Sequence, residues 1–357
     1  MHRPPTNPRR SARVVVVLLG VIAALVILGL MYAVMSATKA PTTPAVHPGG
    51  PAPAAADSGT PAPAGAQPPA PGDKIDAVLD AVLPLRNSQE WGKAETLMAE
   101  AIRQYPGEQV LYLQLGEIYA MQRKSAAAYE QFEKALAIGP REAEIELAAG
   151  TVANDAGRLD RAIEHYQAAQ AARKNDWQAS LFLAQVQMKT GAFEEAKKNL
   201  MLAASAKPDL AVAWGSLAEV LLRENALGPA LQNIAKAREL EPDNMSWRMI
   251  EARALKRDGK PEAALQLLVG LDDAAKSQPG VLPLMGECFG LLRRPADAAA
   301  QYARVSDRFP DNAELAVETA RWFGRASDTA KALEYARRAQ YLGNEDGKKL
   351  AAELEGK

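Results

Sequence analysis

The amino-acid sequence predicts an all-helical repeat protein that follows a membrane-spanning helix and a proline-rich linker. Alanine, the residue with the highest helix propensity, supplies 71 of the 357 residues. Small and apolar residues recur with a constant period of 34 residues from Ile75 onward, which is typical of stacked helical units. A long uncharged apolar run lies near the N-terminus.

The charge and the cysteine content exclude several classes of protein. The 42 basic and 43 acidic residues leave a net charge of -1, which argues against a nucleic-acid partner because no basic excess offsets a phosphate backbone. Cys288 is the only cysteine, so redox CxxC motifs and multi-cysteine zinc sites are excluded. The histidines, His2, His47 and His165, are too scattered to predict a metal site. No motif for a cofactor is present.

The first element is a predicted transmembrane helix over residues 14–35. Its 22 residues carry no charge and would span about 33 Å as a helix, enough to cross a hydrocarbon core of about 30 Å. A cleaved signal peptide is the alternative, but its apolar part would be shorter. Arginines concentrate in residues 1–13, so the positive-inside rule predicts a cytoplasmic N-terminus and an extracytoplasmic remainder.

The second element, over residues 36–74, is a predicted disordered linker. Its central stretch, residues 40–71, holds ten prolines and ten alanines with one charged residue, Asp57. Such a composition cannot bury a core. A passive spacer is the plain interpretation, and the functional one is that it carries the next domain away from the membrane.

The third element is a predicted solenoid of eight 34-residue repeats over residues 75–346. The repeats begin at Ile75, Gln109, Ala143, Trp177, Ala211, Met245, Pro279 and Ala313. The twentieth place is alanine in every one: Ala94, Ala128, Ala162, Ala196, Ala230, Ala264, Ala298 and Ala332. The eighth place is small in seven: Gly116, Gly150, Ala184, Ala218, Ala252, Gly286 and Ala320. Small residues at fixed places allow two helices to approach closely.

These residues resemble the tetratricopeptide repeat, a helix–turn–helix unit with small, aromatic and proline residues at fixed places. The second repeat matches best, through Tyr112, Leu115, Gly116, Tyr119, Ala128, Phe132, Ala135 and Pro140. The sixth repeat is weaker, because Glu251 replaces an apolar residue and Leu271 replaces a late alanine. Residues 347–357 are predicted to form a capping helix over the last repeat.

The resemblance implies a right-handed superhelix whose first helices line a concave face. The early repeats place apolar and acidic residues at the face-lining places, including Leu113, Glu117, Leu147 and Leu181. The later repeats place basic residues there: Arg253, Lys256, Arg257, Arg321 and Arg325. The implied groove would take protein or peptide segments, with acidic ones at the basic end. The alternative is that the leucines pack between repeats and the arginines form a solvated face.

The sequence shows no catalytic motif. His165 is interpreted as a surface or packing residue, and Cys288 as a buried inert thiol. The sequence therefore predicts a non-catalytic interaction scaffold in the inner membrane, with its repeat domain in the periplasm. It would serve envelope assembly, secretion, cytochrome maturation or polysaccharide export. A holdase-type chaperone for exported proteins is the main alternative, and a glycan-binding accessory of an enzyme is a weaker one. The partners and the oligomeric state stay open.

Overall fold

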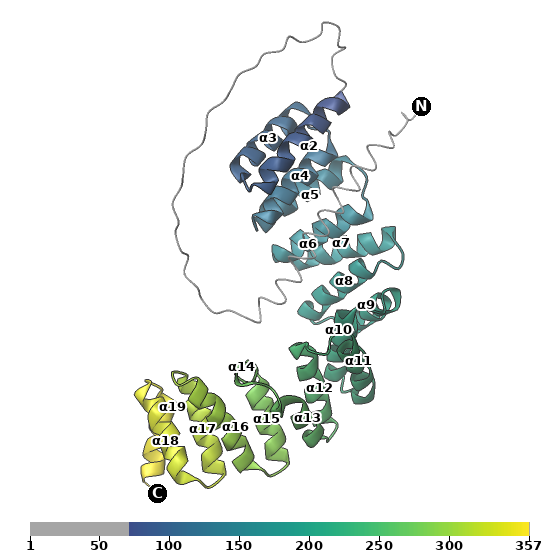
Figure 1. The fold of residues 1–357 in the computed structure, drawn as a ribbon. Coiled ribbons are helices and arrows are strands. Elements are labelled where there is room, and N and C mark those ends of the chain that lie inside the picture. Colours follow the sequence, from purple (N-terminus) through teal and green to yellow (C-terminus); the bar gives the residue numbers. More distant parts are fainter. Residues whose placement is uncertain (1–70, 357) are drawn as a thin grey trace. The chain divides into compact units, whose positions relative to one another are not determined.

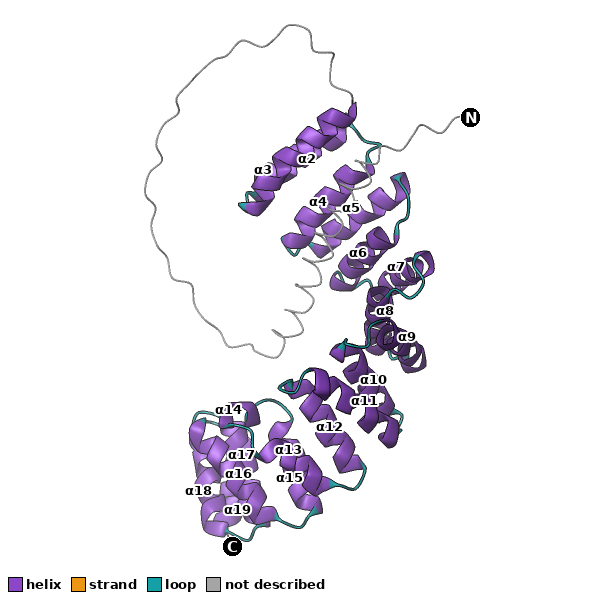
Figure 2. Ribbon diagram, turned by 45° about the vertical axis from the view of Figure 1, so that its right-hand side comes forward, coloured by secondary structure: helices purple, strands orange, loops and turns teal. Residues whose placement is uncertain are grey.

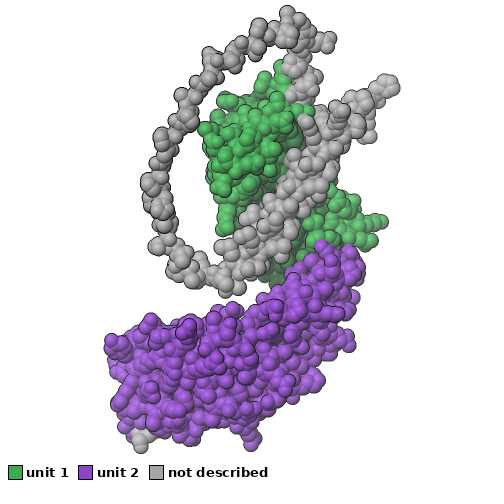
Figure 3. Space-filling view, viewed as in Figure 1, with its two compact units in different colours: residues 1–190 green, residues 191–357 purple. Residues whose placement is uncertain are grey.

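The computed structural model describes residues 71–356, and every regular element in that range is an α-helix. Eighteen helices and no strand are present there (Figures 1 and 2). They form two compact units that divide after Thr190 (Figure 3). The predicted cytoplasmic segment, the transmembrane helix and nearly all of the linker lie outside the described residues. Within them, no helix is both long and apolar enough to cross a membrane.

Unit 1 contains the helices of the first three repeats and the first helix of the fourth. They are α2 (Pro71–Asn87), α3 (Trp91–Gln104), α4 (Gln109–Met121), α5 (Ser125–Ile138), α6 (Ala143–Asp155), α7 (Leu159–Ala172) and α8 (Trp177–Thr190). Unit 2 contains the rest. They are α9 (Phe193–Ala206), α10 (Ala211–Arg223), α11 (Leu227–Leu240), α12 (Met245–Arg257), α13 (Pro261–Val269), α14 (Asp273–Lys276), α15 (Val281–Leu291), α16 (Pro295–Arg308), α17 (Ala313–Arg325), α18 (Thr329–Tyr341) and α19 (Glu345–Glu355).

The helix boundaries follow the 34-residue period closely. The second helix of every repeat begins at the seventeenth place, and six first helices begin at the first place. The fifteenth place of every repeat has a positive φ, at Gln89, Arg123, Gly157, Gly191, Asn225, Gly259, Arg293 and Ser327. A single left-handed residue ends the first helix and reverses the chain into the second. The period therefore sets the turn as well as the helices.

The small residues of the repeat lie where two helices meet. The alanine at the twentieth place is 0% exposed in all eight repeats. At the eighth place the helices also approach closely, because a Cβ added at Gly150 would lie 2.7 Å from the ring of Tyr166. A Cβ at Gly286 would lie 2.7 Å from the ring of Trp322. These places need small residues because an aromatic ring occupies the space.

The sixth repeat departs from the pattern. Its second helix stops at Val269, the short helix α14 follows, and the next first helix begins at Val281, two residues after the predicted start. Leu271 takes the place of the late alanine and is buried. Lys276 is 1% exposed, and its Nζ donates a hydrogen bond to Oε1 of Gln301 at 3.0 Å. The sequence marks this repeat as weak but does not predict the break.

Candidate functional site: the first-helix face

The leucines predicted for the early groove lie inside unit 1. Leu113 is 2% exposed, Leu147 is 3% exposed, and both belong to the hydrophobic cluster formed by α4 to α8. Leu181, in α8, is 4% exposed. Their packing agrees with the alternative interpretation, in which these leucines hold repeats together. A binding role for them stays a prediction.

Glu117 lies in a buried polar network between α2 and α4. Its Oε2 lies 2.5 Å from Nη1 of Arg86 and accepts a hydrogen bond from Nε2 of Gln114 at 3.1 Å. Glu117 is 5% exposed, and its Oε1 has no hydrogen-bond partner. Burial raises the pKa of the Glu117 carboxyl to about 8, although the guanidinium of Arg86 acts in the opposite direction. Glu117 therefore joins the first two repeats and does not lie open to a partner.

The predicted basic residues of unit 2 are largely neutralised by nearby carboxylates. Nη2 of Arg253 lies 2.6 Å from Oε2 of Glu219, a residue 34 positions earlier. Lys256 pairs with Glu287 of the next repeat. Arg321 pairs with Glu318 and also with Asp346, at 3.2 Å, in the capping helix α19. These three cations link neighbouring helices of the repeat array, so much of their charge is compensated within the fold. Binding at the basic end of the groove stays a prediction.

Two of the predicted cations keep their charge uncompensated. Arg257 donates a hydrogen bond from Nη1 to the carbonyl of Leu222 at 2.7 Å, and Arg325 lies over the ring of Trp322 at 4.4 Å. Neither has a carboxylate partner among the described residues. Leu291, which ends the first helix between them, is 62% exposed. Sequence reasoning missed Leu291 and Arg293, although Leu291 lies 34 residues from both Arg257 and Arg325.

His165 and Cys288 are both buried. Nδ1 of His165 lies 2.8 Å from Oε2 of Glu146, and its Nε2 lies 3.2 Å from Oε1 of Glu133. His165 is thus a buried packing residue beside two glutamates, which agrees with the packing interpretation rather than the surface one. Cys288 is 0% exposed, as expected, and burial raises the pKa of its thiol. Among the described residues, neither side chain belongs to a pair of a nucleophile and a general base.

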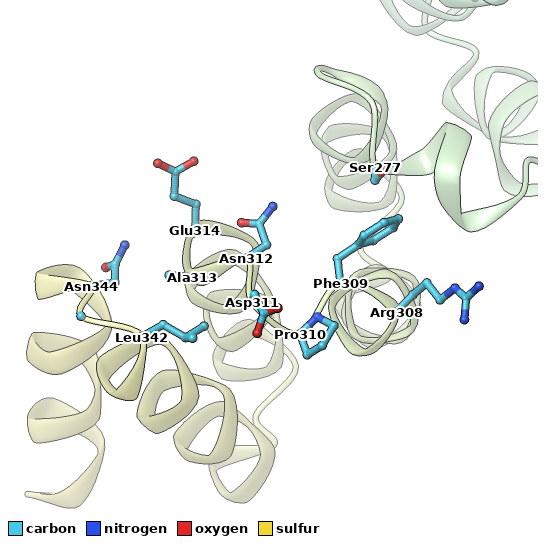
Figure 4. Close-up of a pocket in the computed structure, with 11 residues that line it drawn as sticks. Ser277, Arg308, Phe309, Pro310, Asp311, Asn312, Ala313, Glu314, Leu342 and Asn344 are labelled. Carbon is cyan, nitrogen blue, oxygen red and sulfur yellow. The ribbon is translucent and has the colours of Figure 1, made fainter. Parts of the chain in front are cut away.

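A hollow of about 840 Å³ lies at the loop edge of the last repeats (Figure 4). Two of its polar side chains are used within the fold: Oδ1 of Asn312 caps α17 by accepting from the N–H of Leu315, and Oδ1 of Asn344 caps α19 by accepting from the N–H of Gly347. The labelled side chains do not converge on one point (Figure 4). The hollow therefore offers no convergent set of groups for a ligand.

Comparisons with known proteins agree with this architecture. Residues 153–220 match the family model for the tetratricopeptide repeat. A tetratricopeptide repeat protein from Parabacteroides merdae is similar over 69% of this chain and 98% of its own, with 15% identity and a TM-score of 0.51. The comparison with curated proteins gave no match.

Two further solved structures are similar at lower TM-scores. YrrB, described as a TPR protein with an unusual peptide-binding site, is 20% identical over 50% of this chain and 96% of its own, with a TM-score of 0.45. PilW, described as a type IV pilus biogenesis factor, is 20% identical over 59% and 97%, with a TM-score of 0.49. Tetratricopeptide proteins are generally non-catalytic and bind peptides or proteins. The match over residues 153–220 and the helix-pair fold agree in showing stacked helical repeats of the tetratricopeptide kind in this part of the chain.

Proposed function

We propose that the chain is a single-pass inner-membrane protein whose repeat domain docks partner proteins outside the cytoplasm during assembly of an envelope machine. The observation that carries the scaffold role is the 34-residue array of helix pairs, because stacked helix pairs present a row of first helices with their exposed side chains to a partner. Each unit can therefore offer a partner protein a row of first helices. The location rests on residues 14–35 and on the arginines before them.

The location is tested by the topology of the full chain. A phosphatase that works only outside the cytoplasm, fused after Lys357, is expected to be active, because the arginines of residues 1–13 hold the N-terminus in the cytoplasm. A second fusion that replaces those arginines with glutamate should lose much of this activity. An unmodified fusion that is made at full length but shows no phosphatase activity would contradict both the location and the partner class.

The scaffold role is tested by capture. Immobilised full-length protein is expected to retain a small, reproducible set of envelope proteins in their folded state. The holdase alternative predicts instead loose retention of many unfolded chains and suppression of their aggregation. If a chemically unfolded model protein competes fully for the captured set, the holdase function replaces the scaffold.

A further inference from the structure

We infer that the C-terminal ends of three successive first helices in unit 2 form a docking surface for an acidic, extended segment of a partner protein. We call this surface the arginine edge, and it consists of Arg257, Leu291, Arg293 and Arg325. The inference rests on the proposed scaffold function and names the residues and the partner chemistry that would carry it.

The repeat period places these residues in a row. Arg257, Leu291 and Arg325 occupy the thirteenth place of the sixth, seventh and eighth repeats and end α12, α15 and α17. Arg293 follows Leu291 by two residues, in the left-handed turn. The helices α12 and α15 are in contact, and the Trp322 ring of α17 packs on Gly286 of α15. Equivalent places on stacked repeats therefore form one continuous edge.

The three arginines differ from the other cations of the first-helix face in their partners. Arg257, Arg293 and Arg325 are exposed and have no carboxylate within ion-pair distance among residues 71–356. Arg253, Lys256 and Arg321, a turn or less away, each pair with a carboxylate of a neighbouring repeat or of the capping helix α19. Ion pairs between helices thus compensate Arg253, Lys256 and Arg321, whereas the arginines at the C-terminal ends of the helices keep their positive charge.

Two of the arginines are held in place without losing charge. A carbonyl oxygen fixes Arg257, and an indole ring supports Arg325. A guanidinium has five N–H donors in a rigid plane, so a single neutral contact leaves donors available for a carboxylate. Because part of the side-chain entropy is already lost in the free protein, a partner carboxylate would bind with a smaller ordering cost.

The partner chemistry follows from the spacing and from Leu291. Neighbouring packed helices are about 8–10 Å apart, which matches three residues of an extended chain at about 3.3 Å each. A segment with aspartates three residues apart could therefore meet one arginine per repeat. Leu291, 62% exposed between the charges, would contact an apolar residue of the same segment. A partner with this pattern is an acidic peptide segment rather than a nucleic acid or a uniformly charged surface.

The test is a binding measurement with a defined peptide and the full-length protein. The probe is a labelled peptide of about 12 residues with aspartates three apart and a central leucine. The triple variant Arg257→Gln, Arg293→Gln, Arg325→Gln is expected to bind at least about tenfold more weakly than the wild type at about 0.05 M salt. Wild-type binding should weaken as salt rises, because exposed charges are screened over about 10 Å at 0.1 M. Leu291→Ser should weaken binding only of the peptide that holds the leucine.

The matched control removes the same charge from paired arginines. Arg161, Arg304 and Arg337 pair with Glu164, Asp273 and Glu355. Their triple glutamine variant should bind the peptide within about twofold of the wild type. Equal losses in the two triple variants, or no binding by the wild type at low salt, would overturn the inference. The inference would also be overturned if the wild type bound phosphatidylglycerol vesicles instead of the peptide and the edge variant lost that vesicle binding.

Failure of the edge is distinct from failure of the scaffold. If the edge variant still captures the wild-type set of envelope proteins, the docking surface lies elsewhere and the scaffold function stands. If the wild type captures no defined set, the scaffold function itself fails, whatever the peptide does.

Discussion

Replacing Gly150 with leucine is expected to lower the free energy of unfolding of the third repeat by about 3 kcal/mol or more. A single Cβ at this place would already lie 2.7 Å from the ring of Tyr166, which is 2% exposed and has no room to move. The two helices α6 and α7 must then separate or shift. Because each repeat contacts only its neighbours, amides of α6 and α7 should exchange with solvent before those of distant repeats.

Gly92 provides the matched control for this prediction. It lies in helix α3 with no atom within 4 Å of an added Cβ. Gly92→Ala is therefore expected to stabilise the protein by up to about 1 kcal/mol, through the higher helix propensity of alanine. Gly150→Ala gains the same propensity but meets the Tyr166 ring, so it should destabilise. Equal effects of the two alanine variants on hydrogen exchange would show that the close approach at the eighth place is not a constraint.

Replacing Arg86 with alanine is expected to cost about 3 kcal/mol of stability in the first two repeats at about pH 9. The variant leaves the carboxylate of Glu117 buried without its cation, and only Gln114 remains to donate to it. Lowering the pH should relieve much of this cost, because the carboxyl can then be protonated. Hydrogen exchange of α2 and α4, measured at about pH 5 and about pH 9, compares the two conditions.

The sign of the pH dependence follows from the pKa of Glu117. Burial raises it from the usual 4.5 to about 8, so the folded state favours the neutral carboxyl. The stability that this carboxyl contributes is present below about pH 4.5 and is lost as the pH rises through about 8. Glu117→Gln should abolish this dependence. Arg103→Ala, which removes an exposed arginine 4.0 Å from Glu100, should change the stability by less than about 0.5 kcal/mol at either pH.

The sequence alone determined the helical architecture of the described residues, except for the break in the sixth repeat. Its 34-residue period gave the repeat boundaries that six first helices follow, and the alanine present in every repeat marked contacts that are fully buried. This success has a physical reason. Each repeat must pack on the next with the same geometry, so the same places must be small in every copy. Small residues therefore recur at a constant spacing that can be recognised in the sequence.

The tertiary structure decided which charged residues remain available to a partner. Arg253 and Arg257 look alike in the sequence, but Arg253 reaches Glu219 and Arg257 reaches only a carbonyl. Likewise, a histidine without an evident partner in sequence lies 2.8 Å from a glutamate 19 residues earlier. Such pairs depend on which side chains of adjacent repeats come within about 4 Å. The same pair of residues does not recur from one repeat to the next. The period fixes where the helices lie, whereas the charge left on their surface is set by contacts between individual, non-repeating residues.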